Sequence, residues 1–198
     1  MRIIGGQFRS RKLKAAPASG IRPTSDKLRE TLFNVLGGAV ARSVFMDGYA
    51  GVGAVGIEAL SRGAAFVHFV DRSRKACSII RENLAGLGVQ QGFRILEMQL
   101  PAALDVFRKE GVVFDIAFLD PPYDAKHLYT GALELFASPG LLTGGGVLVI
   151  EHSKRMDIGE GAGSLERYRV LTQGDSSLSF YKEQQTRPND DSNLSRIF

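Results

Sequence analysis

The sequence predicts a doubly wound α/β fold, and three observations support this prediction. Between residues 43 and 153, short apolar runs alternate with segments that have a helical period. The apolar runs are continuous, as expected for parallel strands that helices cover on both faces. A glycine-rich turn follows the first run, at the kind of position where open α/β sheets bind ligands.

Five strands and their connecting helices follow one another in this region. The first strand, 43–47, leads into the glycine-rich turn, and a helix over 53–63 comes next. Gly63 and Gly88 are typical helix ends. The later strands are expected over 65–71, 93–96, 112–120 and 145–153. The later helices are expected over 73–88, 101–109 and 127–138.

The segment before the first strand has a different character. Residues 1–22 have no helical period and contain several glycines, so we expect an irregular arm with at most one short strand or hairpin. The sequence "RPTSDKLRETLFNVLGG" then predicts a helix that Thr24 or Ser25 caps and that Gly37-Gly38 ends. We treat 1–39 as one N-terminal extension.

The end of the chain predicts an antiparallel closure of the sheet. Two β-like runs surround Gly174-Asp175 within 167–182, which is the pattern of a hairpin. Residues 183–198 are mostly polar and are expected to form a disordered tail. The main domain is therefore expected over 40–182, with a mostly parallel sheet and a C-terminal antiparallel hairpin.

Composition limits the class of protein. The chain has 198 residues, enough for one domain, and no apolar run approaches the roughly 18 residues of a membrane helix. A single cysteine, Cys77, excludes an internal disulfide and favours a cytoplasmic protein. Residues 1–30 hold eight Lys or Arg against two acids, a net +6, so the rest of the chain carries −2. This basic arm can neutralise phosphates, although a solvated basic terminus has the same composition.

The glycine-rich turn predicts a nucleotide-type site. Gly51, Gly53 and Gly56 form a G-x-G-x-x-G pattern between strand and helix, where glycines permit a sharp turn and close approach of a ligand. Asp71 ends the next strand, 20 residues after Gly51, a spacing that suits a carboxylate on ribose hydroxyls. The alternative is a close-packed turn in which Asp71 caps the following helix.

The acid before the turn bears on which nucleotide binds. Asp47 lies four residues before Gly51. A pyrophosphate of a nicotinamide cofactor would be repelled by this charge, whereas the amino group and sulfonium of S-adenosylmethionine would be attracted. Residues that contact adenine are expected after the third strand. The candidates there are Glu97, Met98 and Gln99, and Gln99 can hydrogen-bond an adenine edge. The alternative is that this segment is a surface turn.

The fourth strand ends in an unusual tetrapeptide, Asp120-Pro121-Pro122-Tyr123. The prolines fix φ and remove two backbone donors, which leaves carbonyls free to accept hydrogen bonds. A carboxylate, fixed carbonyls and an aromatic ring suit the exocyclic amino group of a nucleobase. Asp120 and a proline carbonyl can orient the nitrogen while Tyr123 stacks on the base, so that positioning promotes direct methyl transfer. No strong nucleophile and no metal-ligand cluster accompanies them.

These motifs resemble a known family. D-P-P-Y is similar to the signature of amino-group methyltransferases that act on adenine, cytosine or guanine. "MRIIGGQFRSRKL", "RPTSDKLRETLFNVL" and "DGYAGVGAVGIEALSRGA" resemble the bacterial small-subunit (16S) ribosomal RNA guanine-N2 methyltransferases, over roughly residues 1–182. The resemblance implies a Rossmann-like class I methyltransferase fold, S-adenosylmethionine as cofactor, and a guanine of small-subunit RNA as target, within an assembled or assembling subunit. No obligate protein partner is evident.

The resemblance also implies roles for individual residues. Asp47, Gly51 and Gly53 would line the methionine end of the cofactor, Tyr49 stands where a phenylalanine is common, and Asp71 would hold the ribose. Asp120 to Tyr123 would hold the target guanine. The residues expected to face RNA, from the basic arm and the R-P-T helix start, are Arg9, Arg11, Lys12, Arg22, Thr24, Lys27 and Arg29.

Three other hypotheses remain open at this point. The first is the same chemistry on another base, such as adenine N6 in RNA or DNA. The second is a nicotinamide-dependent oxidoreductase, which leaves Asp47, D-P-P-Y and the basic arm without a role. The third is a non-catalytic RNA-binding or ribosome assembly factor on the same fold.

Overall fold

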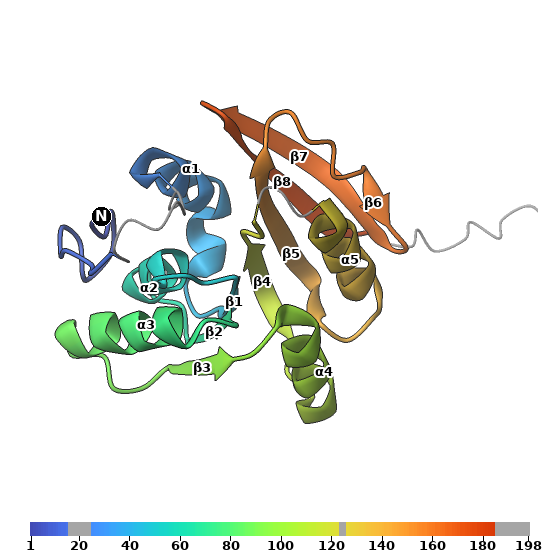
Figure 1. Cartoon of the computed structure of the whole chain (residues 1–198). Helices are drawn as coiled ribbons and strands as arrows, with labels where there is room; N and C mark the ends of the chain where they lie inside the picture. The colour runs from blue at the N-terminus through green and yellow to red at the C-terminus, as the bar shows by residue number, and fades with distance from the viewer. Residues whose placement is uncertain (16–24, 123–125, 185–198) are drawn as a thin grey trace, which may run out of the picture.

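The computed structural model of this chain describes residues 1–15, 25–122 and 126–184. Over these residues it forms an eight-stranded sheet with helices on both faces (Figure 1). The strands are β1 (Val44–Gly48), β2 (Phe66–Asp71), β3 (Phe93–Glu97), β4 (Phe114–Leu119), β5 (Leu142–Ser153), β6 (Gly161–Ala162), β7 (Leu165–Gln173) and β8 (Ser176–Glu183). The helices are α1 (Asp26–Leu36), the 3-10 helix η1 (Gly37–Val40), α2 (Ala54–Ser61), α3 (Arg74–Gly86), α4 (Leu100–Glu110) and α5 (Lys126–Ala137).

The sheet has the predicted topology. Its strand order is β3-β2-β1-β4-β5-β8-β7-β6, and β1 to β5 run parallel. The chain returns through antiparallel β8, which pairs with both β5 and β7. The doubly wound sheet and its closing hairpin are confirmed, and the short β6 is an addition that the sequence did not predict. The order reverses between β1 and β4, and sheets of this class bind ligands at such a switch point.

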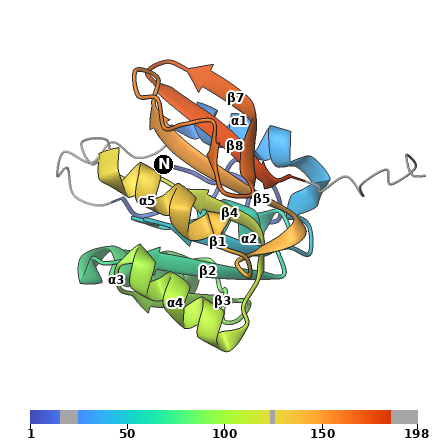
Figure 2. The same ribbon diagram turned by 90° about the vertical axis from the view of Figure 1, so that its right-hand side faces the viewer.

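Two apolar cores lie on opposite faces of the sheet. One unites side chains of α1, α2 and α3 with residues of β1, β2, β4, β5 and β8, including Phe45, Phe69 and Phe118. The other unites α4 and α5 with the opposite face, including Phe107 and Tyr129. Figures 1 and 2 show these two helical layers with the sheet between them. The continuous apolar runs of the strands are therefore explained by burial on both sides.

The N-terminal arm is packed on the domain. Residues 2 and 12 form an antiparallel bridge, and the backbone N–H of Ile3 donates to the carbonyl of Arg11, so the arm is the short hairpin that the sequence allowed. Ile3 and Leu13 are buried in the same core as α1, α2 and α3. Figure 1 shows the arm beside α2 and α3.

The remaining predictions for the termini are resolved in part. Ser25 caps α1, since its hydroxyl accepts the backbone N–H of Leu28, whereas Thr24 lies outside the described residues. The predicted tail lies outside them from residue 185 onward. Within the described ranges, none of the helices has the length and apolar character needed to cross a membrane.

Candidate active site

Three carboxylates gather where adjacent parallel strands end. Asp47 belongs to the end of β1, Asp71 to the end of β2, and Asp120 directly follows β4. Gly48 of β1 is in register with Leu119 of β4, and the backbone N–H of Asp120 donates to the carbonyl of Gly48 at 3.3 Å. The fold therefore places the D-P-P segment beside the glycine-rich turn, although more than 60 residues separate them in the chain.

Two glycines of the turn have different roles. Gly51 has a φ of 56°, in the left-handed region, and a Cβ there would have no neighbour closer than the Tyr49 carbonyl oxygen at 4.0 Å. This backbone is open to close approach by a ligand. A Cβ at Gly56 would instead lie 2.3 Å from the Phe69 ring, so this glycine allows α2 to pack on β2. The turn combines an open face with a tightly packed base.

Tyr49 adopts a φ of 61°, an uncommon conformation for a bulky residue. Its side chain is partly buried against the core of α4 and α5. Burial raises the pKa of the Tyr49 hydroxyl, and the nearby positive charge of Arg72 opposes this shift. The place of Tyr49 beside a cofactor stays a prediction.

Asp47 is almost completely buried, with 2% of its surface exposed. Its Oδ2 accepts the backbone N–H of Gly56 at 2.8 Å. Burial raises the pKa of the Asp47 carboxyl to about 8; the Gly56 bond lowers it, and the charge of Asp71 raises it further. A positively charged ligand group beside Asp47 would favour its ionised form, since an opposite charge stabilises a carboxylate.

Asp71 joins the turn to the next helix. Its Oδ2 accepts the N–H of Gly51 and its Oδ1 accepts the N–H of Ser73, both at 2.8 Å. The alternative role of Asp71 as the cap of the following helix is wrong, because the N-cap of α3 is Ser73, whose hydroxyl accepts the N–H of Ala76. Each carboxylate oxygen can still accept a further bond, because it has two lone pairs. A role in holding ribose hydroxyls is compatible with this arrangement and stays a prediction.

A hydrogen bond from α5 holds the D-P-P segment on its buried side. Pro121 is buried, and its carbonyl accepts the hydroxyl hydrogen of Tyr129 at 3.0 Å, while Pro122 is exposed. Tyr129 is itself completely buried. Sequence reasoning missed Tyr129, because it belongs to a helical apolar pattern that carries no local sign of its partner. Tyr123 lies outside the described residues.

A further carboxylate lies at this edge. Ile150 of β5 is in register with Leu119 of β4, so Glu151 is alongside Asp120 on the neighbouring strand. Glu151 is 3% exposed. The sequence contains a signal for it, a lone acid at the end of an apolar strand, which is the same signal that identified Asp120. Gln99 is exposed directly before α4, and its contact with adenine stays a prediction.

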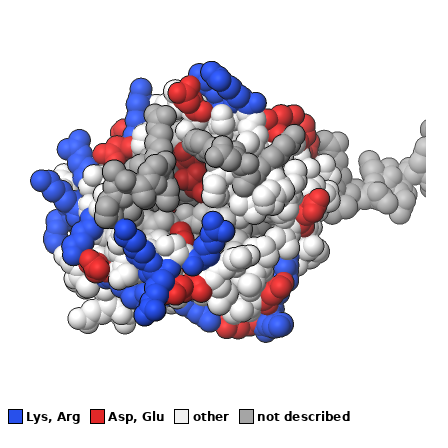
Figure 3. Space-filling model, viewed as in Figure 1, with Lys and Arg blue, Asp and Glu red and all other residues white. Residues whose placement is uncertain are grey.

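Some of the residues predicted to face RNA are exposed in the structure, and others are not. Arg9, Arg11, Lys12 and Lys27 are exposed, whereas Arg22 and Thr24 lie outside the described residues. Figure 3 shows Lys and Arg side chains gathered on the side of the molecule where the arm and α3 lie.

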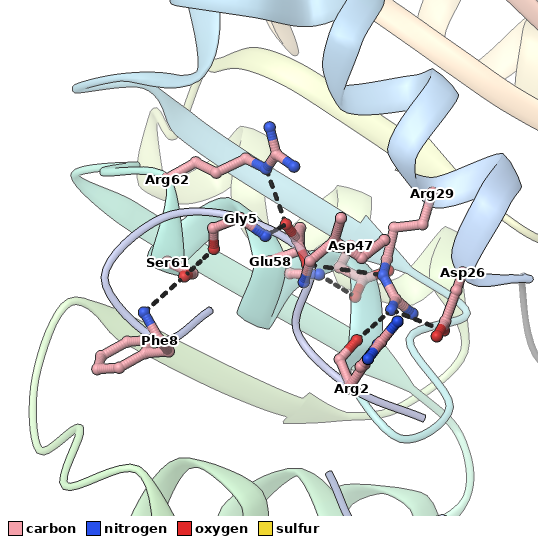
Figure 4. A network of polar contacts seen from close by, with 11 residues as sticks. Arg2, Gly5, Phe8, Asp26, Arg29, Asp47, Glu58, Ser61 and Arg62 are labelled. Carbon is pink, nitrogen blue, oxygen red and sulfur yellow. Dashed lines mark hydrogen bonds and ion pairs between the residues drawn. The ribbon is translucent and has the colours of Figure 1, made fainter. Parts of the chain in front are cut away.

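Arg29 is not at the surface, and its predicted RNA-facing role is wrong. Its side chain is completely buried, with Nη2 donating to the carbonyl of Arg2 and to Asp26 at 3.0 Å. Its Nε lies 3.7 Å from Oε2 of the buried Glu58 (Figure 4). The helical period places residue 29 on the buried side of α1 beside Leu28, where its charge offsets that of Glu58.

Glu58 is the centre of this polar network. Its two carboxylate oxygens accept the N–H groups of Ile4 and Gly5 at 2.8 Å, and Arg62 donates to it from the next turn of the chain. Basic residues therefore have two kinds of place in this protein. Some are exposed, whereas Arg29 and Arg62 interact with Glu58 in the network that holds the arm. No group of His, Cys, Asp and Glu suited to a metal ion is found in the described parts of the chain.

The fold and the strand-edge site define a Rossmann-like protein of the methyltransferase class. A solved structure described as "Putative methyltransferase yhhF from Escherichia coli" superimposes with a TM-score of 0.80 and 28% identity, over 93% of this chain and 98% of that one. The chain belongs to the family described as conserved hypothetical protein 95, whose model matches residues 1–182.

Two relatives in this family have more specific names. "Putative rRNA methyltransferase YlbH" of Bacillus subtilis is 35% identical over 92% of this chain and 99% of its own length. "Ribosomal RNA small subunit methyltransferase D" of Escherichia coli is 35% identical over 76% of this chain and 74% of its own length.

Proposed function

We propose that this protein methylates the exocyclic N2 amino group of a guanine in small-subunit ribosomal RNA, with S-adenosylmethionine as methyl donor. The observation that carries the proposal is the hydrogen bond between Asp120 and Gly48, which joins the D-P-P segment to the glycine-rich turn. Donor and acceptor groups would meet at this junction. The names of the relatives support ribosomal RNA as the substrate.

The cofactor would lie across the glycine-rich turn. Asp47 suits the cationic end of the donor because it is a buried carboxyl whose ionisation a positive charge would favour. Gly51 offers open backbone, with Tyr49 and Gly53 beside it, and Asp71 would accept the ribose hydroxyls. Gln99 would contact the adenine edge.

The acceptor base would be held by the D-P-P-Y segment. When bound, S-adenosylmethionine supplies an electrophilic methyl group on its sulfonium. Asp120 and the carbonyl of Pro122 would each accept an N–H of the guanine amino group and direct its lone pair toward the methyl carbon, with Tyr123 stacked on the base. As the nitrogen gained the methyl group and the sulfur–carbon bond broke, Asp120 or water would accept the surplus proton from the nitrogen.

The Pro121 carbonyl has a supporting part in this proposal. It already accepts the Tyr129 hydroxyl, so it fixes the segment from the protein side. The exposed Pro122 is then better placed than Pro121 to present its carbonyl to a base. The base has to leave any paired stem to reach this edge.

The RNA would extend from the acceptor site toward the basic arm. Lys27 and the arm residues Arg9, Arg11 and Lys12 are exposed and positively charged, and would neutralise phosphates. We include Arg22 and Thr24 in this surface from their position in the R-P-T sequence. The substrate would be an assembled or assembling small subunit.

The test is methyl transfer from methyl-deuterated S-adenosylmethionine to small subunits that lack their own modification. Digestion and mass spectrometry of nucleosides should give labelled N2-methylguanosine. Asp120→Asn should abolish the label and leave RNA binding intact, whereas Asp105→Asn, at an exposed position on α4, should have no effect. A different labelled nucleoside would contradict the choice of base. An unlabelled product with bound cofactor would favour an assembly factor.

A further inference from the structure

Asn83 connects the basic arm to the glycine-rich turn, two segments that are far apart in the sequence. It lies on α3 and is 5% exposed. Its Oδ1 accepts the backbone N–H of Lys14 at 2.7 Å, and its Nδ2 donates to the Lys14 carbonyl at 3.2 Å. The same Nδ2 donates to the carbonyl of Val52 at 3.1 Å. One amide side chain therefore holds the end of the basic arm and the glycine-rich turn together.

The turn needs such external support. Val52 lies between Gly51 and Gly53, whose φ values of 56° and 79° are both in the left-handed region. Glycines gain the most conformational freedom when they are released, so this stretch has many alternative conformations. Three hydrogen bonds help to fix it: the N–H of Gly51 donates to Asp71, the N–H of Gly53 donates to the Ala50 carbonyl, and Asn83 donates to the Val52 carbonyl.

The arm docks on α3 around the same residue. Arg11 donates from Nη2 to the carbonyl of Gly86 at 2.9 Å, and the Lys14 ammonium pairs with Glu82 at 2.8 Å. These two contacts are exposed, and their contribution is therefore small. The two bonds between Lys14 and Asn83 are partly buried and end on a buried amide, so losing them is more costly. Asn83 is thus the main polar attachment of this end of the arm.

We propose that Asn83 is a positioning residue that couples docking of the basic arm to binding of the cofactor at the glycine-rich turn. RNA that binds the docked arm would favour the conformation in which Asn83 hydrogen-bonds to the Val52 carbonyl. The affinity of the turn for the cofactor would then rise. By linkage, bound cofactor strengthens RNA binding by the same factor. The inference rests on the proposed placement of the cofactor at this turn.

The decisive variant is Asn83→Asp, which keeps an acceptor for the Lys14 N–H but loses both amide donors. Equilibrium dialysis with labelled S-adenosylmethionine should show about tenfold weaker binding, as expected for the loss of a buried hydrogen bond. The matched control is Glu82→Gln, which touches the same lysine without reaching the turn and should change affinity by less than about twofold. Unchanged affinity in Asn83→Asp overturns the proposal.

Kinetics separate positioning from a merely structural role. For Asn83→Asp, KM for the donor should rise while kcat at saturating donor stays near that of the unaltered protein. The cofactor affinity of the unaltered protein should increase when small-subunit RNA is added, and this increase should be lost in the variant. A lower melting temperature with an unchanged KM and an unchanged RNA effect would show that Asn83 only stabilises the fold.

A measurement on the unaltered protein covers the case in which the variant does not fold. Saturating S-adenosylmethionine should slow hydrogen exchange at the Lys14 amide, although that amide lies outside the proposed cofactor site. Unchanged exchange there overturns the coupling. Asp71→Ala tests the proposed placement separately: if it leaves donor affinity intact, the placement itself fails, whereas weaker binding in Asp71→Ala but not in Asn83→Asp refutes only the inference.

Discussion

At the scale of single residues, the ionisation of Asp47 links the site to stability. Burial raises the pKa of this carboxyl from 3.8 to about 8 in the folded protein. Between these values the folded state holds a proton that the unfolded state has released. Stability should therefore fall as pH rises from about 4 to about 8 and then stay level with respect to this group. In the cofactor-free protein, ionising the buried Asp47 carboxyl therefore costs free energy, at the position where the cation is proposed to bind.

Asp47→Asn should remove this pH-dependent cost, because asparagine has no charge to bury and can still accept the Gly56 N–H. When the pH is raised from 5 to 8.5, the free energy of unfolding of the unaltered protein should fall by on the order of a few kcal/mol more than that of the variant. Urea unfolding at the two pH values measures the difference. Parallel losses of stability in the two proteins would contradict the assignment. Donor binding by the variant should be weaker at both pH values.

The hydroxyl of Tyr129 supports the acceptor segment from within the core. Tyr129→Phe should lower turnover about tenfold through a displaced Pro121 carbonyl, with little change in donor affinity. The stability cost should be about 1–3 kcal/mol, since a buried acceptor loses its partner. Tyr181→Phe is the matched control, because the Tyr181 hydroxyl donates to the Gly159 carbonyl at 2.8 Å in the same core. Equal loss of turnover in both variants would argue against a positioning role.

At the scale of elements, α2 sets the distance between the glycine-rich turn and residues 7–9 of the arm. The N–H groups of Gln7 and Phe8 donate to Ser61, the last residue of α2, whereas the glycine-rich turn directly precedes its first residue. An eight-residue helix is about 12 Å long. Arg9 is therefore near the far end of α2, and RNA bound there would lie away from the proposed acceptor site.

This geometry predicts that the arm recognises a large substrate. The double variant Arg9→Ala/Arg11→Ala should weaken binding to complete small subunits about tenfold or more, but should affect a short stem-loop that contains the target guanine much less. Filter binding at several salt concentrations should show a shallower salt dependence for the variant on subunits. Lys109→Ala, exposed on α4, serves as the charge control. Equal losses on both substrates would contradict the proposed path of the RNA.

The elements themselves were largely predictable. Each strand from β1 to β5 and each helix from α1 to α5 lies within a few residues of its expected range, because periodicity and glycine ends are local signals. β5 begins at Leu142, earlier than expected, since Thr143 and the glycines that follow give no strand signal. β6 is too short to leave a pattern. Gly37-Gly38 ends α1 but continues as η1, a detail that composition does not determine.

At the scale of the whole molecule, the basic arm is part of the folded core. Ile3 is 1% exposed within the core of α1, α2 and α3. The backbone of the arm also hydrogen-bonds to the buried Glu58 and to Nη2 of the buried Arg29. Removing the arm would leave two buried charges without these partners, which is strongly destabilising. The basic N-terminus is therefore more than a solvated extension.

Ile3→Ala should destabilise the entire protein by about 2–4 kcal/mol, since a buried methyl cluster is lost from a packed core. One cooperative transition should shift to lower denaturant concentration, as expected if arm and domain unfold together. Arg9→Ala, on the exposed side of the same hairpin, should stay within about 0.5 kcal/mol. A separate early transition for the arm, with the main transition unchanged, would show that it is an independent unit.

The sequence by itself determined the order of strands and helices, the glycine-rich turn, and the acids that end β1, β2 and β4. These features depend on residues close together in the chain. The tertiary structure decided that Arg29 is buried, that the pKa of Asp47 is raised, and that Tyr129 holds Pro121. It also decided that Asn83 bonds to Lys14 and Val52, which lie 69 and 31 residues away. Burial and pairing of this kind arise only when distant segments meet, so no local pattern contains them.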